Sequence, residues 1–425
     1  MKTHKSIITN CLLILFIFMI VSCDNKKDAL SPIIIPLAST VGDYNVLNLS
    51  DFATDIKYIP LETNNSVLIG QVIRNIFYEN EEIFILDATF PNTYNCYFFD
   101  NNGKYSRKIG KRGQGPNDYL DINQVSIHED LIYLMAMRKI LVYDISGRLV
   151  KNINLQSNNI PVAYSESSMC SFIPLRKDAF VVSIVKYNGY YPTAYLFETN
   201  QSTVATVKEY PGSVSDKVRR LVSGYELGNM YHFKDDVRLY KASNDTIFTI
   251  GQNKEMKEAF IFDLGKYKIP SSYFEWETTD RETNNRIRSN YIIVGNNITE
   301  SLSHLFIKFD FGNHSPEPFE STGRVFDGKF TSYEVYGIFD KVTGGLTLMR
   351  QPIKGKLGFK NDIDNGPVIW PHYISSNNEL VTYIYPEDFM EYFEKTENPT
   401  PRMTEIAKNL KIDDNPIVII AKLKK

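Results

Sequence analysis

The chain has 425 residues, of which 43% are hydrophobic and 23% charged, and its formal net charge is −3. This is the composition of an ordinary globular protein, and it has no basic excess that would indicate binding to nucleic acid. Its 27 Tyr and 26 Phe, beside only 2 Trp, suit pleated and half-buried surfaces, which favours β-structure.

The first 22 residues have the features of a signal peptide. Two lysines lie among the first five residues, and the run from Cys11 to Val21 is apolar and too short for a comfortable membrane span. This run ends in Ile20-Val21-Ser22-Cys23, which resembles a bacterial lipobox. The resemblance implies that residues 1–22 are removed and that Cys23 carries lipid, which would anchor the protein stably. The alternative is an ordinary cleaved signal peptide with an accidental cysteine.

The residues after Cys23 predict where the folded part begins. Asp24-Asn25-Lys26-Lys27-Asp28 is typical of a solvated tether, and we assign residues 23–40 to a flexible tether and residues 41–425 to a single domain. We therefore expect a lipid-anchored protein of the cell envelope, at the outer membrane, facing either side. The roughly 385 residues after the tether exceed the usual size of one core, so two domains or a repeat architecture is expected.

Two cysteines remain in the mature chain, Cys96 and Cys170, and both lie in apolar, strand-like stretches. An oxidising envelope would allow them to pair. We favour two unpaired core thiols, because free cysteine often behaves as a small buried hydrophobic residue. No Cys-x-x-Cys occurs, so zinc-ribbon and thioredoxin-like chemistry have no support.

A short pattern recurs in the first half of the chain. It consists of an aromatic-aliphatic strand, an acidic residue, a turn containing Gly or Asn, and a second strand, and it occurs at 97–105, 141–149 and, less regularly, 195–203. The spacing of about forty to fifty residues, with four short strands per unit, is typical of β-propeller blades. The Asn-Gly and Ser-Gly steps supply the positive φ that tight hairpins need.

The other predicted strands extend this pattern to the whole chain. Partner strands precede the first two copies, and outer hairpins are expected later, which gives about six blades. We expect the first strand to pair with the C-terminal blade, so that the ring has no exposed edge. These strands are 83–87, 131–135, 244–250, 336–346, 417–423 and, as the first strand, 56–61.

Two stretches interrupt the β pattern. Residues 271–289 are polar and predict one short helix. The other stretch is Pro386–Leu410. Its second part predicts a helix, with Thr400 as the cap and Pro401 in the first turn. The apolar residues of that helix fall at helical spacing, and we expect them to cover the propeller. They are Met403, Ile406, Ala407 and Leu410.

The block from Ile83 to Ile127 resembles an NHL-type propeller repeat, with a strand that ends in Asp, then Phe-Asp-x-x-Gly, then Gly-x-x-Gly-x-Gly-Pro. From about residue 40 onward the chain resembles the six-bladed, NHL-like β-propeller lipoproteins of gut Bacteroidetes. The resemblance implies an all-β, six-bladed β-propeller with short helical insertions at the cell envelope, and it implies no activity or catalytic residue. Segments that carry it are Tyr58–Thr63, Gly110–Tyr119, Gly358–Pro367 and Asp413–Lys422.

Lys111 and Arg112 are candidate ligand-binding residues because they lie in the glycine-rich, basic segment Gly110–Pro116. The segment is not a P-loop, since no Gly-Lys-Ser/Thr ends it. The alternative is a connection between blades that needs positive φ. Lysines and arginines nearby form a local positive patch, which hints at an anionic partner.

Asp362 and Asp364 are weak candidates for binding a divalent metal, because they lie in the oxygen-rich run Asn361–Gly366. The positions of its glycine and the absence of a glutamate at position 12 exclude an EF-hand. The alternative is an Asx-rich turn before Pro367. No other cofactor is indicated.

Histidines are scattered singly, and no His-Glu-x-x-His motif occurs. A propeller can nevertheless gather histidines from different blades on its axis. His372 and Trp370 are candidate ligand-binding residues, because an aromatic cluster beside a polar tip suits sugar recognition. The alternative is that Trp370 packs between blades.

These patterns leave three functional hypotheses. The leading one is a non-catalytic binding or scaffold module that presents a propeller face to an envelope protein, a peptide or a glycan. The second is a metal-assisted lyase, lactonase or glycan-active enzyme, which predicts His, Asp or Glu side chains that converge at the central channel. No Gly-x-Ser-x-Gly elbow supports a serine hydrolase. The third is a structural subunit of an uptake complex.

Overall fold

The computed structural model describes residues 31–424 except 71, 90–92, 123, 137–138, 156–167, 187–193, 211–228, 242–244, 271–286, 296 and 323–327. Ile33–Lys425 forms one compact unit. The predicted signal peptide and the lipidation residue Cys23 lie outside the described residues. No helix in the described part of the chain is long and apolar enough to cross a bilayer.

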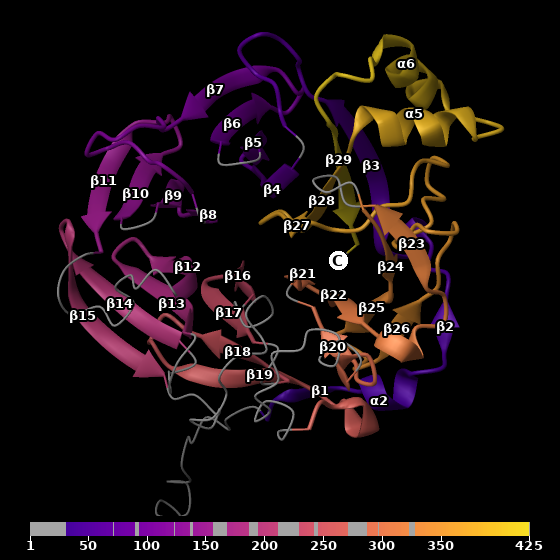
Figure 1. Cartoon of the computed structure of the whole chain (residues 1–425), viewed down its shortest axis with the longest axis horizontal. Coiled ribbons are helices and arrows are strands. Elements are labelled where there is room, and N and C mark those ends of the chain that lie inside the picture. Colours follow the sequence, from indigo (N-terminus) through magenta and orange to yellow (C-terminus); the bar gives the residue numbers. More distant parts are fainter. Residues whose placement is uncertain are drawn as a thin grey trace, which may run out of the picture. The chain divides into compact units, whose positions relative to one another are not determined.

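The unit has a propeller-like, mostly β fold. Antiparallel meanders follow one another in chain order around a common centre, and in each of them successive strands pair (Figure 1). The strands of the first part of the ring are β4 (Val72–Glu79), β5 (Glu82–Thr89), β6 (Thr93–Asp100), β7 (Tyr105–Ile109), β8 (Gln124–His128), β9 (Leu131–Ala136), β10 (Lys139–Asp144), β11 (Leu149–Asn154), β12 (Ser168–Arg176), β13 (Ala179–Lys186), β14 (Ala194–Asn200), β15 (Thr203–Tyr210), β16 (Asn229–Phe233), β17 (Asp236–Tyr240), β18 (Thr246–Ile250) and β19 (Met256–Phe262).

Strands β8 to β15 count as one eight-stranded sheet. Its two halves, β8–β11 and β12–β15, are each an antiparallel meander. A single parallel pair, Asn154 with Thr203, joins β11 to β15.

The second half of the ring is less regular. Two short inner strands both pair with β22, the hairpin β23–β24 forms a sheet of its own, and the last meander contains the C-terminus. The elements are η1 (Gly265–Tyr267), β20 (Ile293–Val294), β21 (Thr299–Glu300), β22 (His304–Asp310), η3 (Gly312–His314), β23 (Phe319–Thr322), β24 (Lys329–Ser332), β25 (Glu334–Asp340), β26 (Leu346–Met349), β27 (Tyr373–Ile374), β28 (Glu379–Ile384), α5 (Pro386–Glu394), α6 (Pro401–Asn409) and β29 (Ile417–Leu423).

The N-terminal segment adds one strand to each of three different sheets. β1 (Ile33–Ile35) pairs in parallel with β19, and β2 (Tyr44–Asn45) pairs in parallel with β26. β3 (Ala53–Pro60) runs antiparallel to β29, with Ile59 opposite Val418. The predicted pairing of the first strand with the C-terminal blade is thus confirmed. The connections contain α2 (Leu37–Thr40) and α3 (Leu49–Phe52).

The predicted tether, residues 23–40, therefore needs a correction at its C-terminal end. β1 and α2 belong to the folded unit, and the side chain of Leu37 is 0% exposed. Ile33-Ile34-Ile35 is a run of β-branched residues, so it has both the strand preference and the apolar surface to join a sheet edge.

The recurring sequence pattern forms the outer hairpins β6–β7 and β10–β11. The carboxylate of Asp100 accepts hydrogen bonds from the backbone N–H groups of Asn102 and Lys104, at 2.8 and 3.0 Å. Gly103 has a φ of 83°, which only glycine adopts at little cost. Asp144 caps the equivalent turn in the same way. The acidic residue and the glycine are therefore both required by the turn.

The core lies between neighbouring meanders. For example, Phe84 and Phe98 of one meander pack in one buried cluster with Leu134 and Tyr143 of the next. Cys96 lies in this cluster, is free, and has a raised pKa because it is desolvated. An unpaired core thiol was predicted there, whereas the side chain of Cys170 lies outside the described residues.

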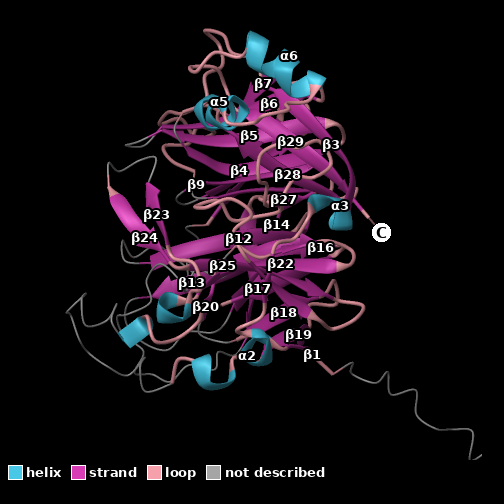
Figure 2. Ribbon diagram, turned by 90° about the vertical axis from the view of Figure 1, so that its right-hand side faces the viewer, coloured by secondary structure: helices cyan, strands magenta, loops and turns pink. Residues whose placement is uncertain are grey.

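The two C-terminal helices cover the last sheet. Thr400 accepts a hydrogen bond from the N–H of Met403, as the predicted cap requires, and Met403 is buried in the core beneath α6. Figure 2 shows α5 and α6 together beside β29 and β3. The helix predicted at 271–289 lies mostly outside the described residues, which omit 271–286.

Candidate functional site

A cavity of about 260 Å³ lies on the axis of the ring, where strands from all of the meanders contribute to its wall. A second cavity of about 330 Å³ adjoins it, because Ile127, His232, Glu300 and Tyr373 border both. We call the two together the axial channel. Pockets for drug-sized ligands span about 300–1,000 Å³. The first compartment is therefore smaller than such a pocket, and the second lies at the lower end of the range.

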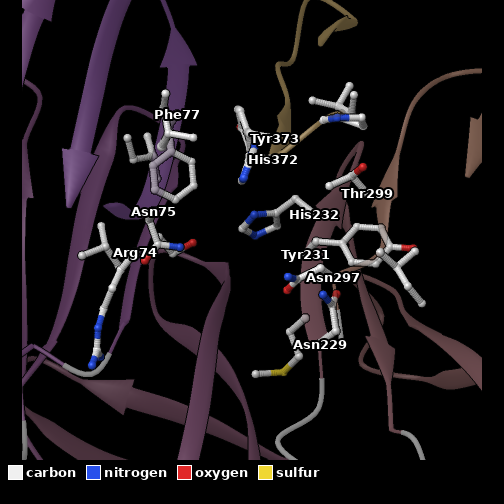
Figure 3. Close-up of a pocket in the computed structure, with 18 of the residues that line it drawn as sticks. Arg74, Asn75, Phe77, Asn229, Tyr231, His232, Asn297, Thr299, His372 and Tyr373 are labelled. Carbon is white, nitrogen blue, oxygen red and sulfur yellow. The ribbon is translucent and has the colours of Figure 1, made fainter. Parts of the chain in front are cut away.

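Polar side chains form much of the wall of the first cavity. In Figure 3, Arg74 and Asn75 from β4 lie opposite Asn297 and Thr299, and Asn229, Tyr231 and His232 from β16 lie between them. Further amide and hydroxyl groups come from β8. They belong to Gln124 and Ser126. The wall therefore offers both donors and acceptors of hydrogen bonds.

Glu300 is the carboxylate that borders both cavities, and its side chain is 0% exposed. It pairs with the guanidinium of Arg238 at 3.1 Å and with the ammonium of Lys341 at 3.0 Å. It also accepts a hydrogen bond from the hydroxyl of Tyr231 at 3.1 Å, and burial beside this carboxylate raises the pKa of Tyr231 well above its usual value. The charge of Glu300 is thus compensated from within the protein.

Two imidazoles stack where the compartments meet. The rings of His128 and His232 lie 4.3 Å apart and are nearly parallel. One ring nitrogen of His232 lies 2.7 Å from the carbonyl oxygen of Pro174. Desolvation, followed by the neighbouring His128, lowers the pKa of His232 to about 3, and desolvation also lowers the pKa of His128. Both rings are therefore neutral near pH 7.

His372 also borders the channel, which places one predicted residue at this site. The residue is exposed, it borders both the first cavity and a side cavity, and its Nδ1 lies 2.8 Å from the hydroxyl of Thr382. The surrounding protein desolvates the ring and Lys308 lies nearby, so the pKa of His372 is lowered. His128, His232 and His372, which are far apart in the sequence, thus all border the axial channel.

Trp370, its predicted companion, faces the core. It is 5% exposed, and its ring packs against those of Phe306, Tyr336 and Phe359. Packing between meanders was the alternative interpretation for this residue. Together with His372, Trp370 borders a side cavity of about 520 Å³ next to the channel. Its role in ligand binding stays a prediction.

Lys111 and Arg112 are both exposed, and neither contributes to the channel wall. Arg112 donates a hydrogen bond to the carbonyl oxygen of Leu120. Gly110 has a φ of 70°, and a Cβ there would lie 2.8 Å from the ring of Tyr119. Gly110 thus has the positive φ that a connection between blades was expected to need, whereas Gly113 and Gly115 do not, and an anionic partner for the basic residues stays a prediction.

Asp362 and Asp364 form hydrogen bonds that connect their loop to the N-terminal segment. Asp362 accepts hydrogen bonds from the backbone N–H and the hydroxyl of Ser50, and Asp364 accepts one from the hydroxyl of Tyr58 at 3.2 Å. Among the described residues, no group of three His, Cys, Asp or Glu side chains is arranged to hold a metal ion.

The sequence did not single out Arg74, Asn75, Glu300 or Lys308, which border the channel. A weak signal was present, because a first strand can carry polar residues at alternate positions, as Gln124, Ser126 and His128 do in Gln124–His128. Recognising it required knowing which strand of each repeat lies innermost.

Three solved structures resemble this one. An exported protein of Bacteroides fragilis is 17% identical, with 93% of this chain and 100% of that chain covered and a TM-score of 0.64. A DUF4221 family member from Bacteroides vulgatus is 10% identical, with 88% and 98% covered and a TM-score of 0.51. Virginiamycin B lyase from Staphylococcus aureus is 12% identical, with 86% and 99% covered and a TM-score of 0.40.

No relative is found among the curated proteins. The model of the family described as a domain of unknown function, DUF4934, matches residues 32–422. This match covers nearly all of the compact unit, from β1 to β29. The chain therefore belongs to the DUF4934 family.

Proposed function

We propose that this protein is an exported, lipid-anchored binding module of the cell envelope, built as a six-bladed β-propeller, and that its axial channel binds a small polar ligand. The ligand is either free or the end of an envelope glycan or peptide. The observation that carries the proposal is the convergence of amide, hydroxyl and imidazole groups from many strands on one axial cavity.

The count of six rests on how the eight-stranded sheet is divided. One parallel pair between Asn154 and Thr203 is all that joins β11 to β15, whereas each half has a full antiparallel ladder. If the halves are counted separately, the ring has six meanders, each contributing a first strand to the channel wall.

The proposed location at the cell envelope is supported by the N-terminal sequence and by one similar protein. Residues 1–22 have the features of a signal peptide, and Ile20-Val21-Ser22-Cys23 resembles a lipobox. The similar Bacteroides fragilis protein is described as exported. Metabolic labelling with an alkyne analogue of palmitate tests the anchor. We expect the protein to be labelled and to fractionate with outer membranes, and a Cys23→Ala variant to lose the label; label on that variant would contradict the proposal.

An enzyme with its site in the channel is the second candidate, because three imidazoles and several carboxylates border the channel, Glu300 on both cavities and Glu79, Glu129 and Asp130 on the second. Binding is favoured because the carboxylate of Glu300 is already engaged in ion pairs with Arg238 and Lys341. Turnover of an envelope glycan or peptide that ends when His232 is replaced would favour the enzyme.

Blocking the channel tests the binding proposal. Asn297 is exposed to the first cavity, so an Asn297→Trp substitution fills that cavity without disturbing the core. Asn409 is exposed on α6, and Asn409→Trp is the matched control. The full-length protein, purified in detergent, is titrated by calorimetry with neutral and acidic monosaccharides and with short peptides.

We expect at least one of these probes to bind the wild-type protein and the Asn409→Trp variant, and to lose binding in the Asn297→Trp variant. Binding that survives in Asn297→Trp would place the ligand elsewhere. The absence of binding by every probe would contradict the proposal of a small polar ligand.

A further inference from the structure

The charges on the wall of the first cavity do not balance. The one carboxylate among the described residues that line it is Glu300, which Arg238 and Lys341 already neutralise from behind. Two more cations, Arg74 and Lys308, border the same cavity. The wall therefore carries an excess of positive charge, although the whole chain has a net charge of −3.

Lys308 is the cation deepest in the wall. It extends from β22 and is half-buried, and its ammonium lies 5.1 Å from the centre of the Tyr336 ring. No carboxylate in the described part of the chain lies within ion-pair distance of it. Glu334 acts on it only from farther away, and desolvation lowers the pKa of Lys308. A desolvated cation without a bound anion is costly, so this position favours a negatively charged ligand.

Lys308 and His372 stand between two cavities, since both border the axial cavity and the side cavity. His372 is neutral near pH 7 because its pKa is lowered, so it adds a donor or acceptor of hydrogen bonds and no charge. An anion beside Lys308 would therefore meet one cation and one polar ring.

Arg74 lies farther out. It is exposed, and its guanidinium lies 5.1 Å from the centre of the Tyr94 ring, with no ion pair to a described residue. In Figure 3 its side chain extends away from the space between Asn75 and His232. A cation in this position raises the local concentration of anions and speeds their entry.

The remaining wall is suited to hydroxyl groups. Asn75, Asn297 and Thr299 face the cavity together with Gln124 and Ser126, and Phe77 and Tyr231 supply flat apolar surface. Amide side chains both donate and accept hydrogen bonds, as a ligand with several hydroxyl groups requires. Aromatic rings pack against the apolar face of such a ligand.

We infer that the ligand of the first cavity of the axial channel is a small sugar acid, whose carboxylate is bound by the ammonium of Lys308 and whose hydroxyl groups are bound by the amides of that cavity's wall. This inference rests on the proposed function and names the chemical class of its ligand. The size of the first cavity limits the ligand to about one sugar ring.

Matched pairs of sugars test the charge. The full-length protein is titrated by calorimetry with galacturonate, glucuronate, gluconate and N-acetylneuraminate, and with galactose and glucose as neutral counterparts. Sodium sulfate is a further probe, because a simple oxyanion site would bind it as well as a sugar acid. We expect at least one acid to bind about tenfold or more tightly than its neutral counterpart, as one charge-assisted hydrogen bond provides.

Variants assign the preference to one residue. Lys308→Met keeps the apolar stem and removes the charge, and we expect it to bring the affinity for the acid down to that for the neutral sugar. Lys408→Met removes an exposed charge on α6 and is the control, which should bind as the wild type does. If Lys308→Met does not fold, Arg74→Met is the second test, because Arg74 is exposed. We expect Arg74→Met to lower the association rate of the sugar acid and to make that rate less dependent on the salt concentration.

Each outcome has a separate meaning. Equal binding of acidic and neutral sugars, lost in Asn297→Trp, would leave the proposed function standing and overturn this inference. Sulfate binding as tight as that of the best acid, and dependent on Lys308, would overturn the sugar part and leave a plain oxyanion site. Binding of no probe would overturn both.

Discussion

Replacing Glu300 by glutamine keeps the size of the side chain and removes its charge. Arg238 and Lys341, each 12% exposed, would then lose their shared carboxylate at 3.1 and 3.0 Å. Removing one partner of a buried ion pair costs about 3–5 kcal/mol, because the other charge stays buried without compensation. We expect Glu300→Gln to lower the free energy of unfolding by about this amount, measured by urea denaturation followed by intrinsic fluorescence.

The control for this experiment is Glu391→Gln. Glu391 of α5 pairs at 2.5 Å with Lys395, the residue that follows the helix, but both side chains are largely exposed, so we expect no measurable change. A Glu300→Gln/Lys341→Met double variant should lose less stability than the sum of the single variants, since each removes the other's partner. Equal effects of Glu300→Gln and Glu391→Gln would refute the idea that this carboxylate holds two buried cations.

Three further predictions concern the ring and its channel. Asn415 is 1% exposed, and its amide oxygen accepts a hydrogen bond from the N–H of Ile69 at 2.7 Å. We expect Asn415→Ala to lower the free energy of unfolding, measured by urea titration, by about 2 kcal/mol or more. An unchanged free energy of unfolding would count against its role as a link between the two ends of the chain. Gly103 has a φ of 83° and faces the carbonyl oxygen of Pro60, so Gly103→Ala should lower the melting temperature, whereas an unchanged value would contradict this close approach. The pKa of His232 is lowered to about 3, so below about pH 6.5 the unfolded chain binds a proton at this residue that the folded chain does not. The free energy of unfolding should therefore fall as the pH drops from about 6.5 towards 3, by up to about 1.4 kcal/mol per pH unit for this group. Urea titrations at a series of pH values should show a smaller slope for His232→Phe than for the wild type.

The outer parts of the fold were predictable because local interactions determine them. Asp100 and Gly103 specify a tight turn within four residues, and the turn leaves its mark on the sequence. The run Ile417–Leu423 is apolar except for the exposed Lys422, and its other residues are buried, as in a strand covered on both faces. The tether was placed too far into the chain because β1 is only three residues long, which is too short for a periodic pattern.

The channel was much less predictable. Glu300 meets Arg238 across 62 residues of sequence and Lys341 across 41, and no local pattern marks such a pair. His372 was identified from its aromatic neighbours, yet it borders the channel while Trp370, two positions earlier, packs into the core. Which side chain faces the axis depends on the twist and register of strands that have only two to nine residues.

The strands contributed by the N-terminal segment determine the order in which the ring can be assembled. Ile33 pairs with Phe260, Tyr44 with Leu348 and Ile59 with Val418, so the first strands to be synthesised pair with strands that are made much later. Contacts of such high contact order slow folding, and edge strands that are still unpaired invite aggregation. The pairing of β3 with β29 therefore forms only once the last strand has been synthesised, and a truncation within β29 should prevent this closure of the ring.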